Sequence, residues 1–447
     1  MRVALCGLLG ALWAGVALAS PQAAEPMTLQ EAVDTALVHH GSVLVAGKQV
    51  AQAESGVTVA QSSYWPQVLA DWQYTFTQSR GGRRFTTLGG IPVGVGGSEE
   101  THQSTLVASY TLLDSGLRKA RLDQARASLQ GSADALDLTR VNLSFRVSSD
   151  YLALVQAQRT VTLAREQVDQ ARDHLALVEA RIEAGFAAAV DRFPLDADLA
   201  QAQLGLVTAE SQTGQASITL RNTIGLAAGP PLEGREPPTE PAVAGLPSLE
   251  EAIAAANRIR PDVLEAQANV RLAEANLDQA RVSTRPVLSL GTTYIIKAEP
   301  APSGTDWVVD AEVSFPLFDA SARRAQAQSA RENLDVAELQ MAQLRKDVEA
   351  QVAQARLAVV TAWERIGAAA ANVTAARKSL ESAEARFKTG LAIPIEVTDA
   401  QLTYYNAQVN ATTALYDYFT ALAALRNAVG LPTLSFEDLR EDRILQP

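Results

Sequence analysis

The sequence lacks most of the residues on which compact enzymes and disulfide-bonded secreted domains depend. It has one cysteine, Cys6, and four histidines among 447 residues, and only 5% of the chain is aromatic. A lone cysteine excludes disulfide bonds within the chain, and so few aromatic residues argue against a large compact core. No serine or cysteine stands in a nucleophile motif, and no glycine-rich phosphate loop follows a strand. We therefore predict no enzymatic activity, no cofactor and no bound metal.

Basic residues and long apolar runs are scarce as well. The chain has 38 lysines and arginines against 50 acidic residues, which gives a formal net charge of −12. Binding nucleic acid requires a concentrated basic face, so nucleic acid is excluded as a partner. Beyond the first 19 residues, no apolar run reaches the ~20 residues that a membrane-spanning helix needs. If the protein enters a membrane, it must do so as strands.

Residues 1–19 have the features of a secretory signal peptide. Arg2 precedes an apolar run, and Ala17-Leu18-Ala19 gives the small-x-small pattern of a cleavage site before Ser20. A membrane anchor at the start of the chain is one alternative, and lipid attachment at Cys6 is another. Such a signal would direct export from the cytoplasm, and its cleavage would leave a mature chain without a thiol.

The rest of the chain is one unit written twice. Thr28–Tyr74 aligns without a gap onto Ser248–Tyr294, a shift of 220 residues, and the later parts align with a shift of 205 residues as far as Gly225 and Gly430. The change in the shift indicates an insertion in the first copy between Tyr74 and Leu112. Because this insertion contains three Gly-Gly pairs, we expect a long flexible loop there.

Each copy contains one stretch without proline that is too long for a small globular domain. The stretches are residues 116–184 and 320–387, and an unbroken helix of that length would reach roughly 100 Å. Their second halves carry apolar residues at alternating spacings of three and four, which is the pattern of a coiled coil. These positions are Val168, Ala171, Leu175, Val178 and Ile182 in the first copy, and Val373, Ala376, Leu380, Ala383 and Phe387 in the second.

Two segments alternate between apolar and polar residues and predict four strands of about ten residues. The apolar positions are Val68, Ala70, Trp72, Tyr74, Phe76, Leu106, Ala108, Tyr110 and Leu112 in the first copy, and Leu288, Leu290, Tyr294, Ile296, Trp307, Val309, Ala311, Val313 and Phe315 in the second. Such strands, with aromatic residues on the apolar face, are typical of membrane β-barrels. Ordinary hairpins on a soluble core are the alternative. Four strands cannot close a barrel alone, so closure would need further copies: two copies give eight strands and three give twelve.

The predicted organisation follows from these elements. It comprises a signal peptide (1–19), a first structural repeat (20–226), a proline-rich linker (227–247), a second repeat (248–431) and a C-terminal tail (432–447). The first repeat contains a β-hairpin (66–113), a long helix (116–184), a tip (185–191) and a return helix. The second contains a β-hairpin (286–317), a long helix (320–387), a tip (388–396) and a return helix.

Several motifs occur once in each copy and in the same order. They are the Leu-x-x-Ala-x-x-x-Ala openings at Leu29 and Leu249, the junctions Tyr110-Thr111-Leu112-Leu113-Asp114 and Phe315-Pro316-Leu317-Phe318-Asp319, the tips Ala180–Phe186 and Ala385–Leu391, and the closing Gly-Leu pairs. In this order the chain resembles the TolC family of outer-membrane channels over nearly its whole mature length. The resemblance implies a mixed, mainly α fold. Long antiparallel coiled-coil helices would form an α-barrel, and four transmembrane β-strands per protomer would contribute to the twelve-strand β-barrel of a homotrimer.

The resemblance also implies a function and partners. The protein would be the outer-membrane exit duct of a tripartite efflux or type I secretion system, a passive channel surrounded by outer-membrane lipid and extending into the periplasm. It would dock to a periplasmic adaptor (membrane fusion) protein and an inner-membrane pump. A structural or tethering coiled-coil protein of the cell envelope is the alternative. The four alternating strands favour the duct, because a tether has no use for them.

By position, the resemblance assigns adaptor docking to Gly185, Phe186, Gly390 and Leu391. It assigns the periplasmic aperture, or gate, to Asp191, Phe387, Glu396 and Asp399. Two positions depart from the family pattern, since Phe387 replaces a gate tyrosine and Ala392 replaces a gate arginine of the best-known member.

The carboxylates of Glu396 and Asp399 are three residues apart and therefore share one helix face. Three copies would gather six carboxylates around a narrow mouth, where they would favour cations and bind blocking metal ions. The alternative is a pair of solvated charges at a helix start. We expect the histidines at positions 39, 40, 102 and 174 to be solvated side chains rather than metal ligands.

Overall fold

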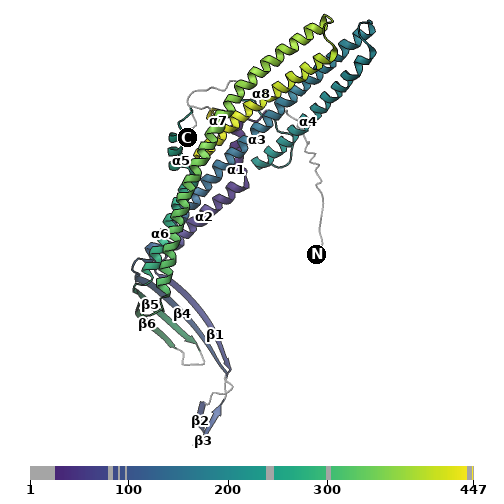
Figure 1. Ribbon diagram of the computed structural model, residues 1–447. Coiled ribbons are helices and arrows are strands. Elements are labelled where there is room, and N and C mark those ends of the chain that lie inside the picture. Colours follow the sequence, from purple (N-terminus) through teal and green to yellow (C-terminus); the bar gives the residue numbers. More distant parts are fainter. Residues whose placement is uncertain are drawn as a thin grey trace, which may run out of the picture. The chain divides into compact units, whose positions relative to one another are not determined.

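The computed structural model describes residues 26–78, 84–88, 91–95, 98–237, 246–298, 304–439 and 445. The predicted signal peptide lies outside the described residues. The helices are α1 (Leu29–His39), α2 (Gly41–Ser62), α3 (Leu117–Glu183), α4 (Arg192–Ile224), α5 (Leu249–Ile259), α6 (Pro261–Val282), α7 (Ala322–Lys388) and α8 (Pro394–Val429), with short 3₁₀ helices η1 (Ala189–Asp191) and η2 (Phe436–Leu439) (Figure 1). The strands are β1 (Gln67–Gln78), β2 (Arg84–Leu88), β3 (Ile91–Val95), β4 (Ser98–Leu113), β5 (Val287–Ala298) and β6 (Gly304–Ser314).

The two halves of the chain show the same order of main elements, with strands β2 and β3 added in the first half. Two short helices lead into a strand pair, a long helix follows, and a second helix returns. The long helices α3 and α7 each contain 67 residues, as the absence of proline predicts. The expected mixed, mainly α fold is confirmed. Among the described helices, none is long and apolar enough to cross a lipid bilayer.

The chain forms two compact units, and each unit takes segments from both sequence copies. Of the described residues, unit 1 takes those within 1–35, 147–241 and 366–416, and unit 2 takes those within 36–146, 242–365 and 417–447. The four-stranded sheet belongs to unit 2. The ends of α3 and α7, together with α4 and the start of α8, belong to unit 1, which therefore holds both predicted tips.

Unit 1 is held together along the predicted coiled-coil seam. Val168 and Ala171 of α3 are buried against Ala202 of α4, and further along Val178 of α3 packs with Leu380 of α7. Small residues in the seam let the helix backbones approach closely. The spacing of three and four residues read from the sequence therefore identifies the buried face of both long helices correctly.

In unit 2, β1, β4, β5 and β6 form one antiparallel sheet in the order β1-β4-β5-β6. Each hairpin was expected on its own, but β4 of the first copy also pairs with β5 of the second, with Leu106 opposite Tyr294. The sequence could not show this pairing because the two strands are far apart in the chain. The sheet leaves β1 and β6 as its two edges.

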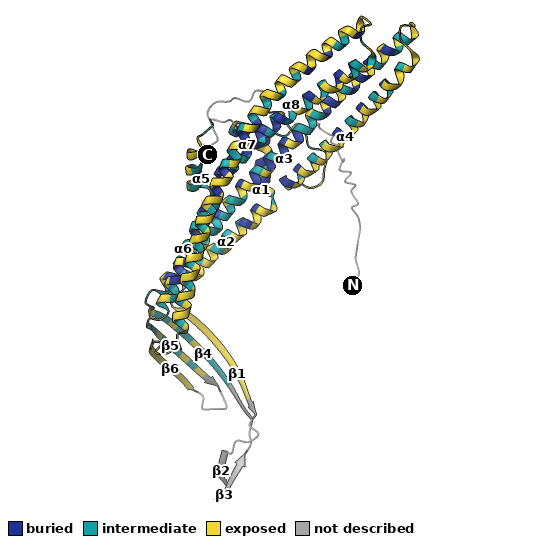
Figure 2. Ribbon diagram, in the orientation of Figure 1, coloured by how far each residue is buried: buried dark blue, intermediate teal, exposed yellow. Residues whose placement is uncertain are grey.

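The two faces of the sheet differ, as the alternation predicts. Across the strands the register brings Trp72, Leu106, Tyr294 and Trp307 to one face, whereas Asp71 and Asp310 belong to the other. The apolar side chains are exposed, and every residue of β6 is exposed (Figure 2). A sheet with an uncovered apolar face is incomplete as a soluble structure.

The expectation of a flexible loop between the strands of the first copy needs correction. Strands β2 and β3 pair there as a second, two-stranded sheet, with Arg84 opposite Val95 and Leu88 opposite Ile91. Strands β1 and β4 also run further than predicted, to Gln78 and from Ser98. The Gly-Gly pairs that suggested a loop fall in residues 79–83, 89–90 and 96–97, outside the described residues. Alternation over these five-residue strands is too short to detect by pattern.

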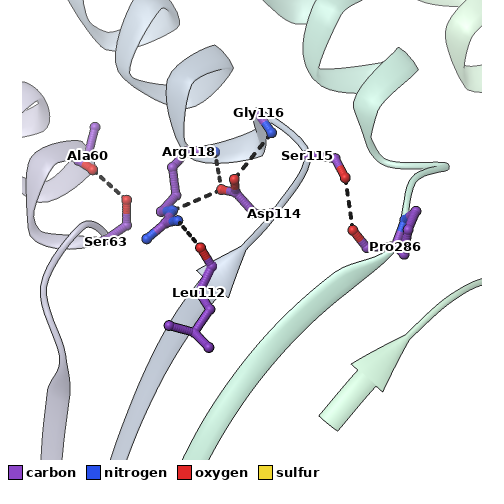
Figure 3. Close-up of polar contacts among 8 residues, drawn as sticks. All are labelled: Ala60, Ser63, Leu112, Asp114, Ser115, Gly116, Arg118 and Pro286. Carbon is purple, nitrogen blue, oxygen red and sulfur yellow. Dashed lines mark hydrogen bonds and ion pairs between the residues drawn. The ribbon is translucent and has the colours of Figure 1, made fainter. Parts of the chain in front are cut away.

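The junction between β4 and α3 shows what the repeated Asp motif does. The Asp114 carboxylate accepts hydrogen bonds from the backbone N–H of Gly116 (3.2 Å) and Arg118 (2.6 Å) and from Nε of Arg118 (3.0 Å) (Figure 3). These bonds satisfy free N–H groups at the start of the helix and hold the pKa of Asp114 below its ordinary value against the opposing effect of burial, the largest single influence on it. The Ser115 hydroxyl donates to the carbonyl of Pro286 (2.9 Å), which ties the start of α3 to that of β5. Asp319 accepts from Arg323 N–H in the same way at α7 (3.2 Å).

Candidate docking tips and aperture

The two tips are the turns α3–α4 and α7–α8, and they lie at the same end of unit 1 (Figure 1). Each long helix ends at a glycine in the left-handed conformation, Gly185 (φ +76°) and Gly390 (φ +78°). The N–H of Phe186 bonds to the carbonyl of Arg181, and that of Leu391 to the carbonyl of Arg386, both at 2.8 Å. This is the Schellman arrangement, in which glycine avoids the cost of a Cβ in left-handed backbone. The two tips therefore have the same backbone geometry.

Apolar side chains stand exposed at both tips. Phe186 is 84% exposed and Leu391 is 72% exposed, directly after the two glycines. Three further exposed apolar residues near the turns were not singled out from the sequence: Val190, Phe193 and Ile393. Their signal is that each lies just before or within the first turn of a return helix. Large apolar side chains gathered at a tip are suited to contact with another protein.

Phe387, predicted as an aperture residue, is only 4% exposed. It packs in a cluster with Val178 of α3, Leu195 of α4 and Val397 of α8. The Arg181 guanidinium lies 4.2 Å from the centre of its ring, a cation–π distance. In this conformation Phe387 joins the helices of the tip and presents almost no surface to solvent.

His174 was expected to be solvated, and this expectation is wrong. The side chain is only 6% exposed, and its ring meets the Phe387 ring edge-on at 5.3 Å. Its Nε2 lies 3.2 Å from the carbonyl oxygen of Pro394, the first residue of α8. A carbonyl only accepts, so Nε2 carries the proton and donates it.

The carboxylates of the predicted aperture have different surroundings. Glu396 lies 3.2 Å from the Arg386 guanidinium, which also donates to the carbonyl of Leu391 (3.2 Å). Asp399, one turn further along α8, is exposed. The Asp191 carboxylate, in the last residue of η1, accepts the N–H of the N-cap residue Ala188 (3.1 Å). Glu396 therefore belongs to the α7–α8 tip together with Leu391, whereas Asp191 stabilises its own turn.

One carboxylate near the tips was not identified from the sequence. Asp198 of α4 has a buried oxygen, Oδ2, without a hydrogen-bond partner among the described residues. Its charge raises the pKa of His174, as does that of Glu384 on α7, but burial has the larger effect and lowers this pKa below its ordinary value of 6.5. The interior of the tip thus combines a neutral imidazole with nearby acidic groups. Within the described residues, no group of histidine and acidic side chains is arranged to hold a metal ion.

Comparison with known proteins identifies relatives of the whole arrangement. The sequence model of one family, described as outer membrane efflux protein, matches residues 32–226 and 252–431. Protein CyaE of Bordetella pertussis is 27% identical over 363 residues, covering 80% of this chain and 71% of that protein. Outer membrane protein TolC of Vibrio cholerae is 26% identical over 435 residues, covering 92% of each. A crystal structure of CusC, a protein described as forming a transmembrane channel, superimposes with a TM-score of 0.77 at 17% identity, covering 90% of this chain and 92% of that one.

Proposed function

Because the chain belongs to the outer membrane efflux protein family, we propose that it is the exit duct of a tripartite efflux or type I secretion system. In this proposal three copies form a passive channel through the outer membrane and across the periplasm. The tips dock to a periplasmic adaptor protein, which connects the duct to an inner-membrane pump. The pump supplies the energy and selects the cargo.

Family membership establishes the coarser part of this description. The protein is an outer-membrane channel of the efflux or secretion type, it resides in the cell outer membrane and extends into the periplasm, and it is not an enzyme. Its fold is that of outer-membrane channels. The trimer, the partners and the roles of single residues are proposals.

The edges and faces of the four-stranded sheet give the strongest support for a channel built from several copies. Among the strands that the structure describes, β1 and β6 have a neighbour on one side only, so their outer N–H and C=O groups need partners. A bilayer does not tolerate such open edges, and pairing β6 of one copy with β1 of the next removes both. Three copies would close a barrel of twelve strands, with the exposed tryptophans 72 and 307 toward lipid and Asp71 and Asp310 toward the lumen.

Helix α4 supports the same assembly, because it carries a seam of small and apolar residues on each of two opposite faces. One face, which includes Leu195, Ala202 and Ala209, is buried within unit 1. A second seam on the opposite side is exposed throughout and repeats at spacings of three and four residues. It consists of Phe193, Ala197, Ala200, Leu204, Val207, Ser211, Gly214 and Ile218. A coiled-coil seam of this kind suits a helix of a neighbouring copy.

The tips support docking to an adaptor. Phe186 and Leu391 stand exposed on hydrogen-bonded turns, where an apolar partner would cover them. Gly185 and Gly390 have no neighbouring atoms within 4 Å of a Cβ position, so a partner backbone has room to approach. The two tips have the same geometry and so offer related sites.

The decisive test is the mass and conductance of the protein extracted from an outer membrane. We expect a detergent-solubilised trimer that conducts ions in planar bilayers. A tether of the cell envelope would give a soluble monomer or dimer without conductance, and that result would refute the proposal. Crosslinking from cysteines introduced at positions 185 and 390, with the unmodified protein as the control, should capture an adaptor of the periplasm.

A further inference from the structure

We propose that Arg181 and His174 position the α7–α8 turn at the aperture, and that protonation of His174 releases it. This inference rests on the proposed function, because it assumes that the tips surround the mouth of a channel. Both residues would act through the turn that they hold, and neither needs to contact the cargo.

The two residues lie on one face of α3, two helical turns apart. Arg181 donates a hydrogen bond from Nη2 to the carbonyl of Lys388 (3.1 Å), the last residue of α7. His174 bonds to the carbonyl of Pro394 (3.2 Å), the first residue of α8. The turn between α7 and α8 is therefore fixed to α3 at both of its ends.

Phe387 connects the two contacts. The Arg181 guanidinium covers its ring at 4.2 Å, and the His174 ring meets it at 5.3 Å. An arginine on an aromatic face contributes most when water is excluded, as it is around this buried ring. The position at which the family pattern has a tyrosine thus contributes to this contact through its ring, without a hydroxyl group.

The charged groups around His174 come from three helices. Asp198 of α4 and Glu384 of α7 raise its pKa, and Arg181 of α3 lowers it. Phe387 of α7 meets the ring edge-on, and the hydrogen bond to the Pro394 carbonyl of α8 also raises the pKa of His174. Burial is the largest effect and favours the neutral ring. We call the tip closed when both contacts with the α7–α8 turn are formed, and in this state His174 is uncharged at neutral pH.

The direction of the pH effect follows from this lowered pKa. Once the tip opens to water, the ring returns to its ordinary pKa of 6.5 and binds a proton more readily than in the closed tip. The closed tip therefore loses stability relative to the open one as the pH falls below about 6.5. The hydrogen bond to Pro394 favours the charged ring, but the cost of burying that charge is larger, so protonation weakens the closed tip on balance.

The experiment records the purified full-length protein in planar bilayers between pH 7.5 and 5.5. We expect the open probability of the wild type to rise on the order of threefold or more on acidification. His174→Asn and His174→Phe should abolish this rise. His40→Asn is the matched control and should retain it, since His40 caps α2 through a bond from Ser42 N–H and lies outside the tip.

Two further variants separate a positioning role from a merely structural one. Asp198→Asn should shift the midpoint of the pH response to lower pH, because it removes a charge that favours protonation. Arg181→Gln should raise the open probability at pH 7.5 several-fold while a pH response through His174 remains. If the His174 variants fail to assemble, the direction in which Asp198→Asn shifts the midpoint of the pH response tests the inference instead.

A wild-type channel whose open probability is the same at both pH values would overturn the inference. So would an unchanged pH response in His174→Asn, or a shift of Asp198→Asn to higher pH. These results differ from failure of the proposed function, in which the wild type would conduct at no pH and the inference would fall with it.

Discussion

Glycines in left-handed backbone follow helices α3, α4, α7 and α8, and they differ in what surrounds them. Gly390, at the end of α7, has φ +78° and open space where a Cβ would stand. Gly430, after α8, has φ +95°, and a Cβ there would lie 2.7 Å from the Cα of Arg260. At Gly390 only the left-handed backbone requires a glycine, whereas at Gly430 the close approach of Arg260 requires one as well.

Replacement by alanine should distinguish these two roles. Gly390→Ala should lower the free energy of unfolding by about 1–2 kcal/mol, the cost of left-handed backbone for a residue with a Cβ. Gly430→Ala should cost more, because the backbone of Arg260 must also move. Chemical unfolding of the detergent-solubilised protein would measure both. Equal losses in the two variants would show that the close contact with Arg260 has no energetic importance.

The residues of the site could be predicted from sequence only in part. The tip glycines follow from the repeated Arg-x-x-x-Gly pattern, which the structure explains by helix-end hydrogen bonds. The burial of Phe387 agrees with the coiled-coil spacing, since this residue continues the seam of Leu380. His174 also had a signal, because it lies three residues after Ala171 and four before Val178. What a local pattern could not supply is the contact with Pro394, which is 220 residues away in the chain.

At the scale of single elements, the exposed seam of α4 makes a prediction about assembly. Leu204→Glu combined with Val207→Glu places charges on this seam, away from the buried face of the helix. We expect each protomer to fold but the trimer to be lost, because an assembled seam would bury like charges without partners. The mass of the detergent-extracted protein measures the outcome. Gln201→Glu with Gln212→Glu, at exposed positions beside the seam, is the control and should still assemble; equal masses for both variants would argue against α4 as an interface.

Elements with a long regular pattern were predicted well, and those defined by pairing were not. The coiled-coil spacing and the absence of proline define α3 and α7, because helix formation depends on residues close in sequence. The alternation over β1 and β6 is similarly local. The union of both hairpins through β4 and β5 depends on partners from different copies, and no local pattern encodes it. The short strands β2 and β3 fall below the length at which alternation can be recognised.

At the scale of the whole molecule, the sequence repeat and the compact units divide the chain in different ways. Each unit combines segments of both copies, so the compact units do not coincide with the copies. A sequence of low aromatic content can fold in this way because its helices pack along extended seams, between α3 and α4 of the first copy and between α3 of the first copy and α7 of the second. The same reasoning extends to the assembly, where the open edges of the sheet and the second seam of α4 need further copies.

The acidic mouth proposed for the assembled channel leads to a prediction about ion preference. Glu396 is paired with Arg386 at 3.2 Å, whereas Asp399 is exposed one turn further along the same helix. Glu396, Asp399 and Arg386 together contribute one net negative charge per protomer. Removing Glu396 leaves the charge of Arg386 unpaired and cancels the net negative charge of the three residues. The expected loss of cation preference is therefore larger than the weak Glu396–Arg386 ion pair alone would suggest.

Single-channel recording in a salt gradient can therefore separate charge from structure. Glu396→Ala and Asp399→Ala should each reduce the preference for cations, and the double variant should reverse it toward anions, because it leaves Arg386 as the remaining charge of the three. Glu396→Ala combined with Arg386→Ala is the matched control. It removes the same carboxylate but restores one net negative charge per protomer, so its cation preference should stay close to that of the wild type. An unchanged preference in the Glu396→Ala, Asp399→Ala double variant would mean that these carboxylates do not line the conducting mouth, and the selectivity would then have to arise elsewhere along the channel.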